Sequence, residues 1–234
     1  MRVVAVIQAR MGSSRLPGKV LAPLAGEPLL KRLIARVRPA RRLDGLIVAT
    51  SQAPADDAVA AVCAATGTAC FRGSETDVLG RFIAAADSLD ADIAVRLTGD
   101  NPAVDASLVD YVLDRALPHM PPAVYVHNVD DSGFPRGLYV EAATMAALRT
   151  AAGDADDTDR EHVTWHLRRR PEAFPAVVVK APGRFAEVSL TVDTHEDLRR
   201  LNDIFRSLYR SAPDFDFRAF MVAADPAAAM DAKP

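Results

Sequence analysis

The 234-residue chain is half apolar and carries 28 Lys and Arg against 31 Asp and Glu, a net charge of −3. This balance suits one soluble domain, or one domain with an appendage, and not a nucleic-acid-binding protein, which is normally basic with aromatic platforms. The longest apolar runs are strand-sized, which argues against a membrane span or membrane partner and predicts a cytoplasmic protein.

From residue 3 to residue 117, short β-branched runs alternate with helical stretches. We predict strands at 3–7, 46–49, 69–71 and 93–97, and helices at 29–37, 56–65, 75–89 and 105–117. Near-continuous apolar strands indicate an α/β fold, a parallel sheet covered by helices on both faces. Ligands of such sheets bind at the carboxyl ends of the strands, so the segments that follow these strands share one rim.

After Pro118 the alternation breaks. We predict strands at 124–126, 138–140, 177–179 and 188–192, helices at 142–152, 160–169, 195–209 and near 217–222, and an acidic loop at 153–159. The polar excursion at 120–145 is typical of a lid or a dimerisation arm. Residues 1–210 form the predicted single domain. Residues 211–234 form a C-terminal tail, whose Ala-, Asp- and Pro-rich end we expect to be frayed.

The first predicted strand leads directly into a loop of small and basic residues. Residues 8–19 read Gln-Ala-Arg-Met-Gly-Ser-Ser-Arg-Leu-Pro-Gly-Lys. Small residues let backbone N–H groups approach an anion, and Arg10, Arg15 and Lys19 supply positive charge. The spacing is neither that of a Walker loop nor that of a dinucleotide fingerprint. The loop predicts a phosphate cradle, with a solvated basic turn as the alternative.

Two aspartates follow predicted strands. Asp100 lies in Leu-Thr-Gly-Asp-Asn-Pro, and Asp193 ends Ser-Leu-Thr-Val-Asp. Mg²⁺ is usually held by one or two carboxylates plus substrate phosphates, so the pair predicts one Mg²⁺ site if the two strands lie together. The structural alternative for Asp100 is an Asx-turn or a helix cap before Asp105. Thr194 and Asp197 can cap the last long helix, which leaves Asp193 unexplained.

Two further clusters carry charged residues. Ser74 is a suitable helix N-cap with Asp77 three residues on, and an ion pair with Asp77 is a sufficient structural account of Arg81. In the irregular half, an Arg-Glu-His run ends at His162, the one histidine in a charged cluster that suggests a site.

Six motifs occur in order: QARMGSSRLPGK, RGSETDVLGRF, RLTGDNP, FPRGL, REHVT and VDTHEDL. Together they resemble the bacterial cytidylyltransferase-like family of spore-coat polysaccharide biosynthesis proteins, related to the CMP-Kdo and CMP-sialic acid synthetases, over residues 3–205. The resemblance implies a Rossmann-like nucleotidyltransferase fold. It also implies a Mg²⁺-dependent reaction in which CTP and a sugar acid or related acceptor give a CMP conjugate and pyrophosphate, for surface-polysaccharide or glycoconjugate precursors.

The resemblance also implies residue roles. CTP would be bound by Gln8, Ala9, Arg10, Gly12, Ser13, Ser14, Arg15, Lys19, Ser74, Asp77, Arg81 and Thr98. The catalytic residues would be Arg15, Lys19 and Asp100, and the metal ligands Asp100 and Asp193. The acceptor would be bound by Arg136, Glu141, Arg160 and His162. Because related synthetases exchange arms, a homodimer is expected.

One departure from the family concerns the acceptor. The motif Gly-Leu-Asp-Val-Glu is expected, but this chain has Tyr139 in place of the aspartate, which leaves the acceptor open. A metal-dependent glycosyltransferase is the first alternative function, although Thr-Gly-Asp-Asn replaces the usual Asp-x-Asp motif. A non-catalytic nucleotide-binding relative is the second, and the presence of Lys19, Asp100 and Asp193 argues against it.

Overall fold

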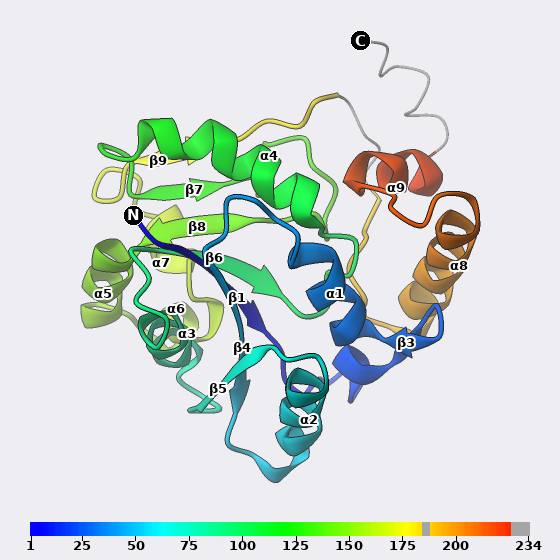
Figure 1. The fold of residues 1–234 in the computed structure, drawn as a ribbon. Coiled ribbons are helices and arrows are strands. Elements are labelled where there is room, and N and C mark those ends of the chain that lie inside the picture. Colours follow the sequence, from blue (N-terminus) through cyan, green and yellow to red (C-terminus); the bar gives the residue numbers. More distant parts are fainter. Residues whose placement is uncertain (184–187, 226–234) are drawn as a thin grey trace.

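Seven strands form one sheet in the computed structural model, which describes residues 1–183 and 188–225 (Figure 1). In sheet order the strands are β5 (Ala69–Gly73), β4 (Gly45–Ser51), β1 (Val3–Gln8), β6 (Ile93–Thr98), β8 (Glu141–Thr144), β7 (Tyr125–His127) and β9 (Ala176–Val178). The first four are parallel, and β8 is antiparallel to β6 and β7. A small separate ribbon pairs β2 (Pro23–Leu24) with β3 (Glu27–Pro28).

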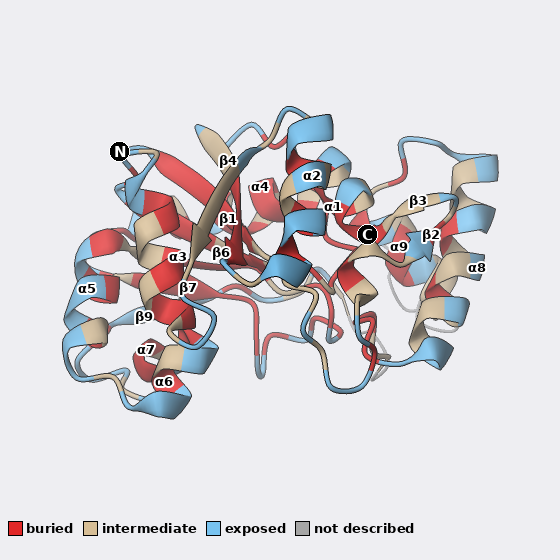
Figure 2. Ribbon diagram, turned by 90° about the horizontal axis from the view of Figure 1, so that it is seen from below, coloured by how far each residue is buried: buried red, intermediate tan, exposed pale blue. Residues whose placement is uncertain are grey.

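Helices cover both faces of the sheet (Figures 1 and 2). On one side lie α1 (Leu29–Val37), α2 (Asp57–Ala65), α4 (Ala106–Ala116), α8 (His195–Ser211) and α9 (Phe217–Ala224). On the other lie α3 (Val78–Asp87), α5 (Met145–Gly153), α6 (Asp157–His162) and α7 (Trp165–Arg168). Short 3₁₀ turns cover Lys19–Leu21, Pro54–Asp56 and Leu117–His119.

The central strand β1 is apolar at successive positions because it is buried on both faces of the sheet. Val3, Ala5 and Ile7 pack into one core cluster, whereas Val4 and Val6 pack into the other. Successive side chains of a strand point to opposite faces, so a strand covered on both sides is apolar at every position. Buried residues accordingly line the sheet and the inner faces of the helices (Figure 2). The predicted α/β class with a mainly parallel sheet is confirmed.

The strand–helix alternation predicted for residues 3–117 is present in full. The helix expected at 75–89 is shorter, because Asp77 accepts a hydrogen bond from Gly80 N at 3.0 Å and caps the helix there. The prediction that Ser74 is the cap was therefore wrong. The Ser74 hydroxyl instead accepts from Asp77 N at 3.0 Å and tightens the preceding turn.

The strand predicted at 138–140 does not form, and β8 begins only at Glu141, where a helix was expected from residue 142. The cause is the buried side chain of Asn128, which replaces a neighbouring strand. Its amide donates to Leu138 O at 2.7 Å, and its oxygen accepts from Val140 N at 2.6 Å. Leu138 and Val140 are thus buried without belonging to the sheet, and Tyr139 between them is half-buried.

The strand predicted at 188–192 is also absent, because its backbone bonds to loops. Leu190 N donates to Arg136 O, and Val192 N donates to Asp100 O at 2.9 Å. The helix predicted at 160–169 is two short helices, separated at Val163 by a positive φ of 56°. The acidic loop predicted at 153–159 partly belongs to α6, where Asp156 and Asp159 form a capping box.

Part of the segment 120–145 belongs to the sheet as β7 and β8, and the loop 128–140 between them lies outside it. A role of this segment as a lid or dimerisation arm stays a prediction. Near the C-terminus, Phe217 and Phe220 of α9 are buried in the same core cluster as Phe205 of α8. The end expected to be frayed lies, from residue 226, outside the described residues. Among the residues that are described, no helix is long and apolar enough to cross a membrane.

Candidate active site

The loop after β1 and the loop after β6 meet at one edge of the sheet. The register pairs Gln8 with Thr98, so both strands end together. Gly99 N donates to Gln8 O at 2.7 Å. A Cβ atom on Gly99 would lie only 2.9 Å from that oxygen and 3.0 Å from Ala9 Cβ. Glycine is therefore required here for the two loops to approach, and the rim predicted from the strand order is present.

A cavity of about 670 Å³ opens at this rim. The predicted site residues that line it are Gln8, Ala9, Arg10, Gly12, Ser13, Ser14, Arg15, Lys19, Arg81, Thr98, Asp100, Arg136, Glu141, His162 and Asp193. Asp77 and Arg160 instead line an adjoining cavity of about 540 Å³, where they form an ion pair of 3.3 Å. Ser74 lines neither cavity. The placement thus brings most of the predicted residues together, while their roles stay predictions.

The loop after β1 is fixed at its base and open at its tip. Met11 N donates to a carboxylate oxygen of Asp56 at 2.6 Å, and Gly18 N donates to Met11 O at 2.9 Å. Gly18 adopts a φ of 73°, which lets the chain turn into the 3₁₀ segment that begins at Lys19. In the part of the chain that the structure describes, the backbone N–H groups of residues 12–14 donate no hydrogen bond. Free N–H groups beside cations are the features of an anion cradle.

Asp56 is a buried residue beside the candidate phosphate loop that the sequence analysis did not select. It is 2 % exposed and accepts hydrogen bonds from Met11 N, from Ser51 N at 3.2 Å and from the Ser51 hydroxyl. A buried carboxylate with three donors joins the end of β4 to the phosphate-loop candidate. The sequence signal was the Thr-Ser pair that ends β4, five residues before an aspartate that was assigned only to the start of a helix.

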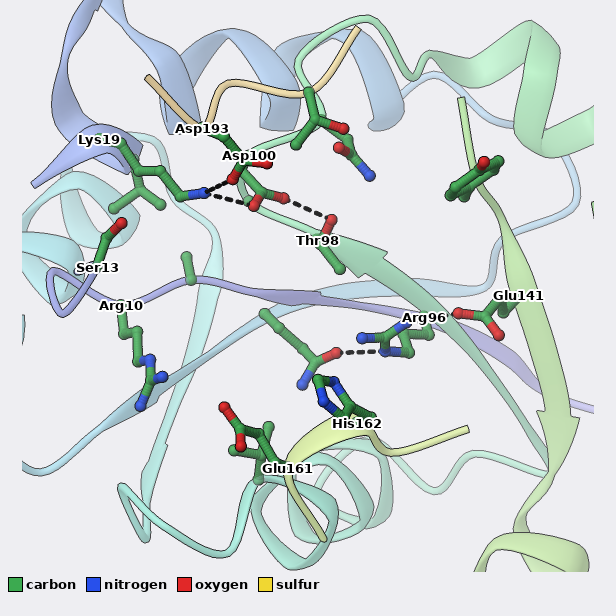
Figure 3. A pocket seen from close by; sticks show the side chains of 18 of the residues that line it. Arg10, Ser13, Lys19, Arg96, Thr98, Asp100, Glu141, Glu161, His162 and Asp193 are labelled. Atoms are coloured by element: carbon green, nitrogen blue, oxygen red, sulfur yellow. Dashed lines mark hydrogen bonds and ion pairs between the residues drawn. The ribbon is translucent and has the colours of Figure 1, made fainter. Parts of the chain in front are cut away.

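Lys19 joins the two candidate metal ligands. Its Nζ lies 2.7 Å from Asp100 Oδ2 and 2.9 Å from Asp193 Oδ1 (Figure 3). Arg15 and Arg136 each contact Asp193 as well, at 2.9 and 2.8 Å. Three cations therefore surround two carboxylates, and this part of the cavity carries a net positive charge. Such a charge balance favours a polyanionic ligand.

The structural alternative for Asp100 is wrong. Asp105 caps α4, accepting from Leu108 N at 2.9 Å, whereas the Asp100 carboxylate accepts from the Thr98 hydroxyl at 2.7 Å and from Lys19. The predicted cap of α8 by Thr194 is confirmed. Among described residues there is no group of three or more His, Cys, Asp or Glu that could hold a metal ion. Two carboxylates at one point nevertheless fit Mg²⁺, whose other ligands are commonly substrate phosphates and water.

On the opposite side of the cavity, Glu141 holds an arginine that the sequence analysis did not select. Arg96 donates to Glu141 at 2.5 Å and to the Gln8 side chain at 2.7 Å (Figure 3). The other Glu141 oxygen accepts from the Tyr125 hydroxyl. Burial alone would raise the pKa of Glu141, but the Arg96 guanidinium and the Tyr125 hydrogen bond hold it below its ordinary value. The missed signal was an arginine inside an otherwise apolar strand.

Arg81 is bound differently from the expected ion pair. Its guanidinium donates to Ser74 O and to Glu75 O, and Asp77 pairs with Arg160 instead. Burial lowers the pKa of Arg81, and the nearby charge of Arg10 lowers it further. The Arg81 side chain thereby links the start of α3 to the main cavity.

The break between α6 and α7 turns two residues toward the cavity. Glu161 and His162 line it, and Val163 follows with a positive φ that a β-branched residue rarely adopts (Figure 3). Behind the break, the fully buried Asp159 carboxylate lies 2.8 Å from His166 Nδ1 and accepts from Arg169 at 2.6 Å. Strained backbone of this kind persists where the surroundings fix it, and it is common at functional sites.

The chain is similar to proteins of one known family. The family model described as "Cytidylyltransferase" matches residues 4–223. The chain belongs to the cytidylyltransferase family. This confirms the family resemblance and the nucleotidyltransferase fold expected from the six motifs.

Individual relatives are similar to this chain over most of their own length. The spore coat polysaccharide biosynthesis protein SpsF of Bacillus subtilis is 36 % identical, over 87 % of this chain and 86 % of SpsF. A cytidylyltransferase structure from Leptospira borgpetersenii serovar Hardjo-bovis has a TM-score of 0.89 and 28 % identity, covering 97 % of this chain and 95 % of that one. A CMP:2-keto-3-deoxy-manno-octonic acid synthetase complexed with CTP has a TM-score of 0.66 and 19 % identity, covering 88 % and 99 %.

Proposed function

We propose that this cytidylyltransferase transfers CMP from CTP to a sugar acid or related acceptor and releases pyrophosphate, in the synthesis of surface-polysaccharide or glycoconjugate precursors. The observation that carries the proposal is the open N–H loop of residues 12–14 beside two aspartates that share Lys19. The names of the relatives support the nucleotide and the acceptor class: SpsF is a polysaccharide biosynthesis protein, and the synthetase structure contains CTP.

We call the part of the cavity that is lined by the loop after β1 and by Arg81 the nucleotide half. It has donors and cations enough to bind several phosphates. The open N–H groups, Arg10, Arg15 and Lys19 come from one loop, so a triphosphate can contact all of them at once. Arg81, which is buried beside Arg10, lies toward the nucleoside, and Ser74 and Asp77 precede it at the start of α3. The phosphate groups add negative charge where the free protein has an excess of positive charge.

Asp100 and Asp193 would hold the divalent cation, which we propose to be Mg²⁺. When bound there, Mg²⁺ neutralises phosphate charge and makes the α-phosphorus a better electrophile. Lys19 contacts both carboxylates, so it must exchange at least one of these contacts for the phosphates when substrate binds.

The reaction is in-line displacement at the α-phosphorus. An acceptor oxygen forms the new O–P bond while the bond to the β-phosphate oxygen breaks, and pyrophosphate leaves with the bonding electrons. Lys19 and Arg15 stabilise the negative charge on the departing group, and the cavity aligns the two substrates. An acceptor hydroxyl must give up its proton during this step, whereas a phosphate or phosphonate nucleophile is already ionised.

The acceptor binds in the other half of the cavity, which we call the acceptor half. Arg136, Glu141 and His162 line that half, and Arg160 lies in the adjoining cavity. Of these, Glu141 acts through Arg96, because both of its oxygens already accept hydrogen bonds. We further propose a cytoplasmic homodimer.

The proposal is tested by a pyrophosphate-release screen. Purified protein, Mg²⁺ and each nucleoside triphosphate are combined with sugar acids, sugar phosphates and phosphonates. The expected result is pyrophosphate and a CMP conjugate in equal amounts, with CTP preferred. Absence of CTP binding and of pyrophosphate across the panel would contradict the proposal. Transfer from a UDP-sugar without pyrophosphate would assign a glycosyltransferase instead, and full cellular function of a Lys19→Ala variant would assign a non-catalytic role.

A further inference from the structure

Arg168 lines the acceptor half of the cavity, and the two terminal nitrogens of its guanidinium are unused among the described residues. It ends α7, and its side chain is 24 % exposed. The Nε atom is buried and makes no hydrogen bond, and neither terminal nitrogen donates to any residue that the structure describes. The Nε atom instead lies 3.4 Å from the exposed carboxylate of Asp130, with which it forms an ion pair. The two terminal nitrogens therefore keep their N–H donors free for a bound anion.

The other arginines of this half are already committed. Arg96 donates to Glu141 and Gln8, and Arg136 donates to Asp193. The guanidinium of Arg168 instead lies 4.8 Å from the centroid of the Trp165 ring. A flat aromatic partner fixes the plane of a guanidinium without using its N–H groups. Arg168 is thus held in place while its terminal N–H groups remain available for a ligand.

Tyr139 faces the same region. It lines the cavity, and within residues 1–183 and 188–225 its hydroxyl has no hydrogen-bond partner. Burial raises the pKa of Tyr139, the charge of Asp130 adds to this effect, and Arg136 and Arg168 oppose it. The phenol therefore lies among two cations and one exposed carboxylate. It is a neutral donor where an aspartate would repel an anion.

The triphosphate does not account for these donors. Its cations come from the loop after β1, and Arg10 and Ser13 lie on the side of the cavity opposite Arg96 and Glu141 (Figure 3). Arg168 belongs to the Glu141 side, because its charge is among those that lower the pKa of Glu141. An anion bound by Arg168 would therefore belong to the second substrate and not to the triphosphate.

We propose that Arg168 and Tyr139 form the subsite for an acidic group of the acceptor, a carboxylate or a phosphoryl group. This inference rests on the proposed function and narrows its acceptor to molecules that carry such a group away from the attacking oxygen. The guanidinium receives two oxygens of the acid side by side, and the phenol donates to one of them. The exposed Asp130 carboxylate loses its single loose ion pair and turns to solvent.

The test measures acceptor binding separately from nucleotide binding. The protein is saturated with Mg²⁺ and the α,β-methylene analogue of CTP, which cannot release pyrophosphate, and is titrated calorimetrically. One arm compares 2-keto-3-deoxy-manno-octonic acid with its methyl ester, and a second compares hexose phosphates with the free hexoses. The variants are Arg168→Gln, Arg168→Lys and Tyr139→Phe. Arg206→Gln, at an exposed position of α8, is the matched control.

The wild-type protein is expected to bind one class of acid at least tenfold more tightly than its neutral partner. Arg168→Gln should weaken that acid about 10- to 100-fold and remove the preference over the neutral partner, with the affinity for the CTP analogue unchanged. Arg168→Lys should restore part of the preference, and Tyr139→Phe should reduce it to a smaller extent. The arm that shows the preference distinguishes a carboxylate from a phosphoryl group.

The inference is overturned if Arg168→Gln keeps the full preference, or if the wild-type protein binds the CTP analogue but prefers neither class of acid. Failure to bind the CTP analogue overturns the proposed function itself, and the inference with it. Circular dichroism and thermal unfolding of each variant show whether a loss of binding is a loss of folding. Arg168→Lys and Tyr139→Phe, which change the fewest contacts, keep the test decisive if Arg168→Gln does not fold.

Discussion

The two halves of the cavity are built in different ways. The nucleotide half consists of loops that directly follow parallel strands, and its register is set by the ladder between β1 and β6. The acceptor half consists mainly of the loop 128–140, the break between α6 and α7, and the segment 188–193, none of which forms sheet; Arg96 of β6 and Glu141 of β8 complete it. Side chains, notably Asn128, provide the backbone hydrogen bonds there that strands provide in the first half. Substitutions in the loops of the acceptor half can therefore alter acceptor binding without disturbing the strands that position the nucleotide half.

The nucleotide half should respond most strongly to loss of Lys19, because this one ammonium contacts both candidate metal ligands. We expect Lys19→Met to lower kcat/KM for pyrophosphate release about 10³-fold, since a pre-positioned charge that stabilises developing anion is lost. Lys31→Met is the control, because Lys31 is exposed and, among the described residues, has one ion-pair partner, Glu27 at 2.7 Å. It should stay within about twofold of wild type, as exposed pairs contribute little. A Lys19→Met protein that keeps a tenth of the activity would contradict the assignment.

The two aspartates test whether both halves contribute equally to the metal site. Asp100 follows β6, whereas Asp193 follows an irregular segment that is held by Val192 N donating to Asp100 O. Each change to Asn should lower activity about 10²-fold or more and raise the Mg²⁺ concentration needed for half-maximal rate, because one of only two protein carboxylates is lost. The control is Asp203→Asn, at an exposed position of α8. A mild effect at Asp193 with a severe one at Asp100 would place the metal on the strand end alone.

Asp56 tests how the phosphate loop is held. Asn at this position can no longer accept all three hydrogen bonds, which come from Met11 N and from both polar groups of Ser51. We expect Asp56→Asn to raise KM for CTP about tenfold with a smaller change in kcat, and to lower the free energy of unfolding by about 1–3 kcal/mol. Ser51→Ala keeps the contact to Met11 and should leave KM nearly unchanged. Lower stability with an unchanged KM would assign Asp56 a purely structural role.

These two halves also differ in how far the sequence predicts them. Up to residue 117, apolar alternation predicted every strand of the main sheet and every α-helix, and it placed the loop after β1 and Asp100 on one rim. Parallel strands that are covered on both faces have a distinctive pattern. The short ribbon of β2 and β3 and the 3₁₀ turns were not predicted. In the acceptor half, residues 138–140 and 188–192 have the same apolar pattern and are not strands. Burial under loops produces the same pattern as burial in a sheet, and a single sequence does not distinguish the two.

The contacts that the sequence could not supply are those made across long separations. Arg96 and Glu141 are 45 residues apart, and Met11 and Asp56 are also 45 residues apart. Nothing local marks either pair, whereas the cap of α8 by Thr194 and Asp197 lies within three residues and was predicted correctly. The motifs predicted which residues share the cavity. Which charged side chains pair with one another could be seen only in the structure.

Asn128 is the counterpart of Asp56 in the acceptor half. Asn128→Ala would leave Leu138 O and Val140 N buried without partners. We expect KM for the acceptor to rise about fivefold while KM for CTP stays constant, and the free energy of unfolding to fall by about 1–3 kcal/mol for each unpaired group. Steady-state kinetics with each substrate varied in turn separates the two constants. A rise in KM for CTP of the same size would show that the halves are coupled and would break the comparison.

The smallest expected effect is a pH dependence of stability at Glu141, in the acceptor half. Its pKa is lowered in the folded protein, so the folded state favours the ionised carboxylate that accepts from Arg96. The resulting stability is fully present above the pKa of the unfolded chain and is lost as the pH falls through the folded value. Glu141→Gln should therefore be less stable than wild type by about 1–2 kcal/mol at pH 7, because a hydrogen bond to a charged partner is replaced by a neutral one. The difference should shrink as the pH falls below the ordinary glutamate range. Denaturant unfolding of both proteins from pH 7 down to the acid transition measures it, and a constant difference at all pH values would show that Glu141 is not ionised beside Arg96.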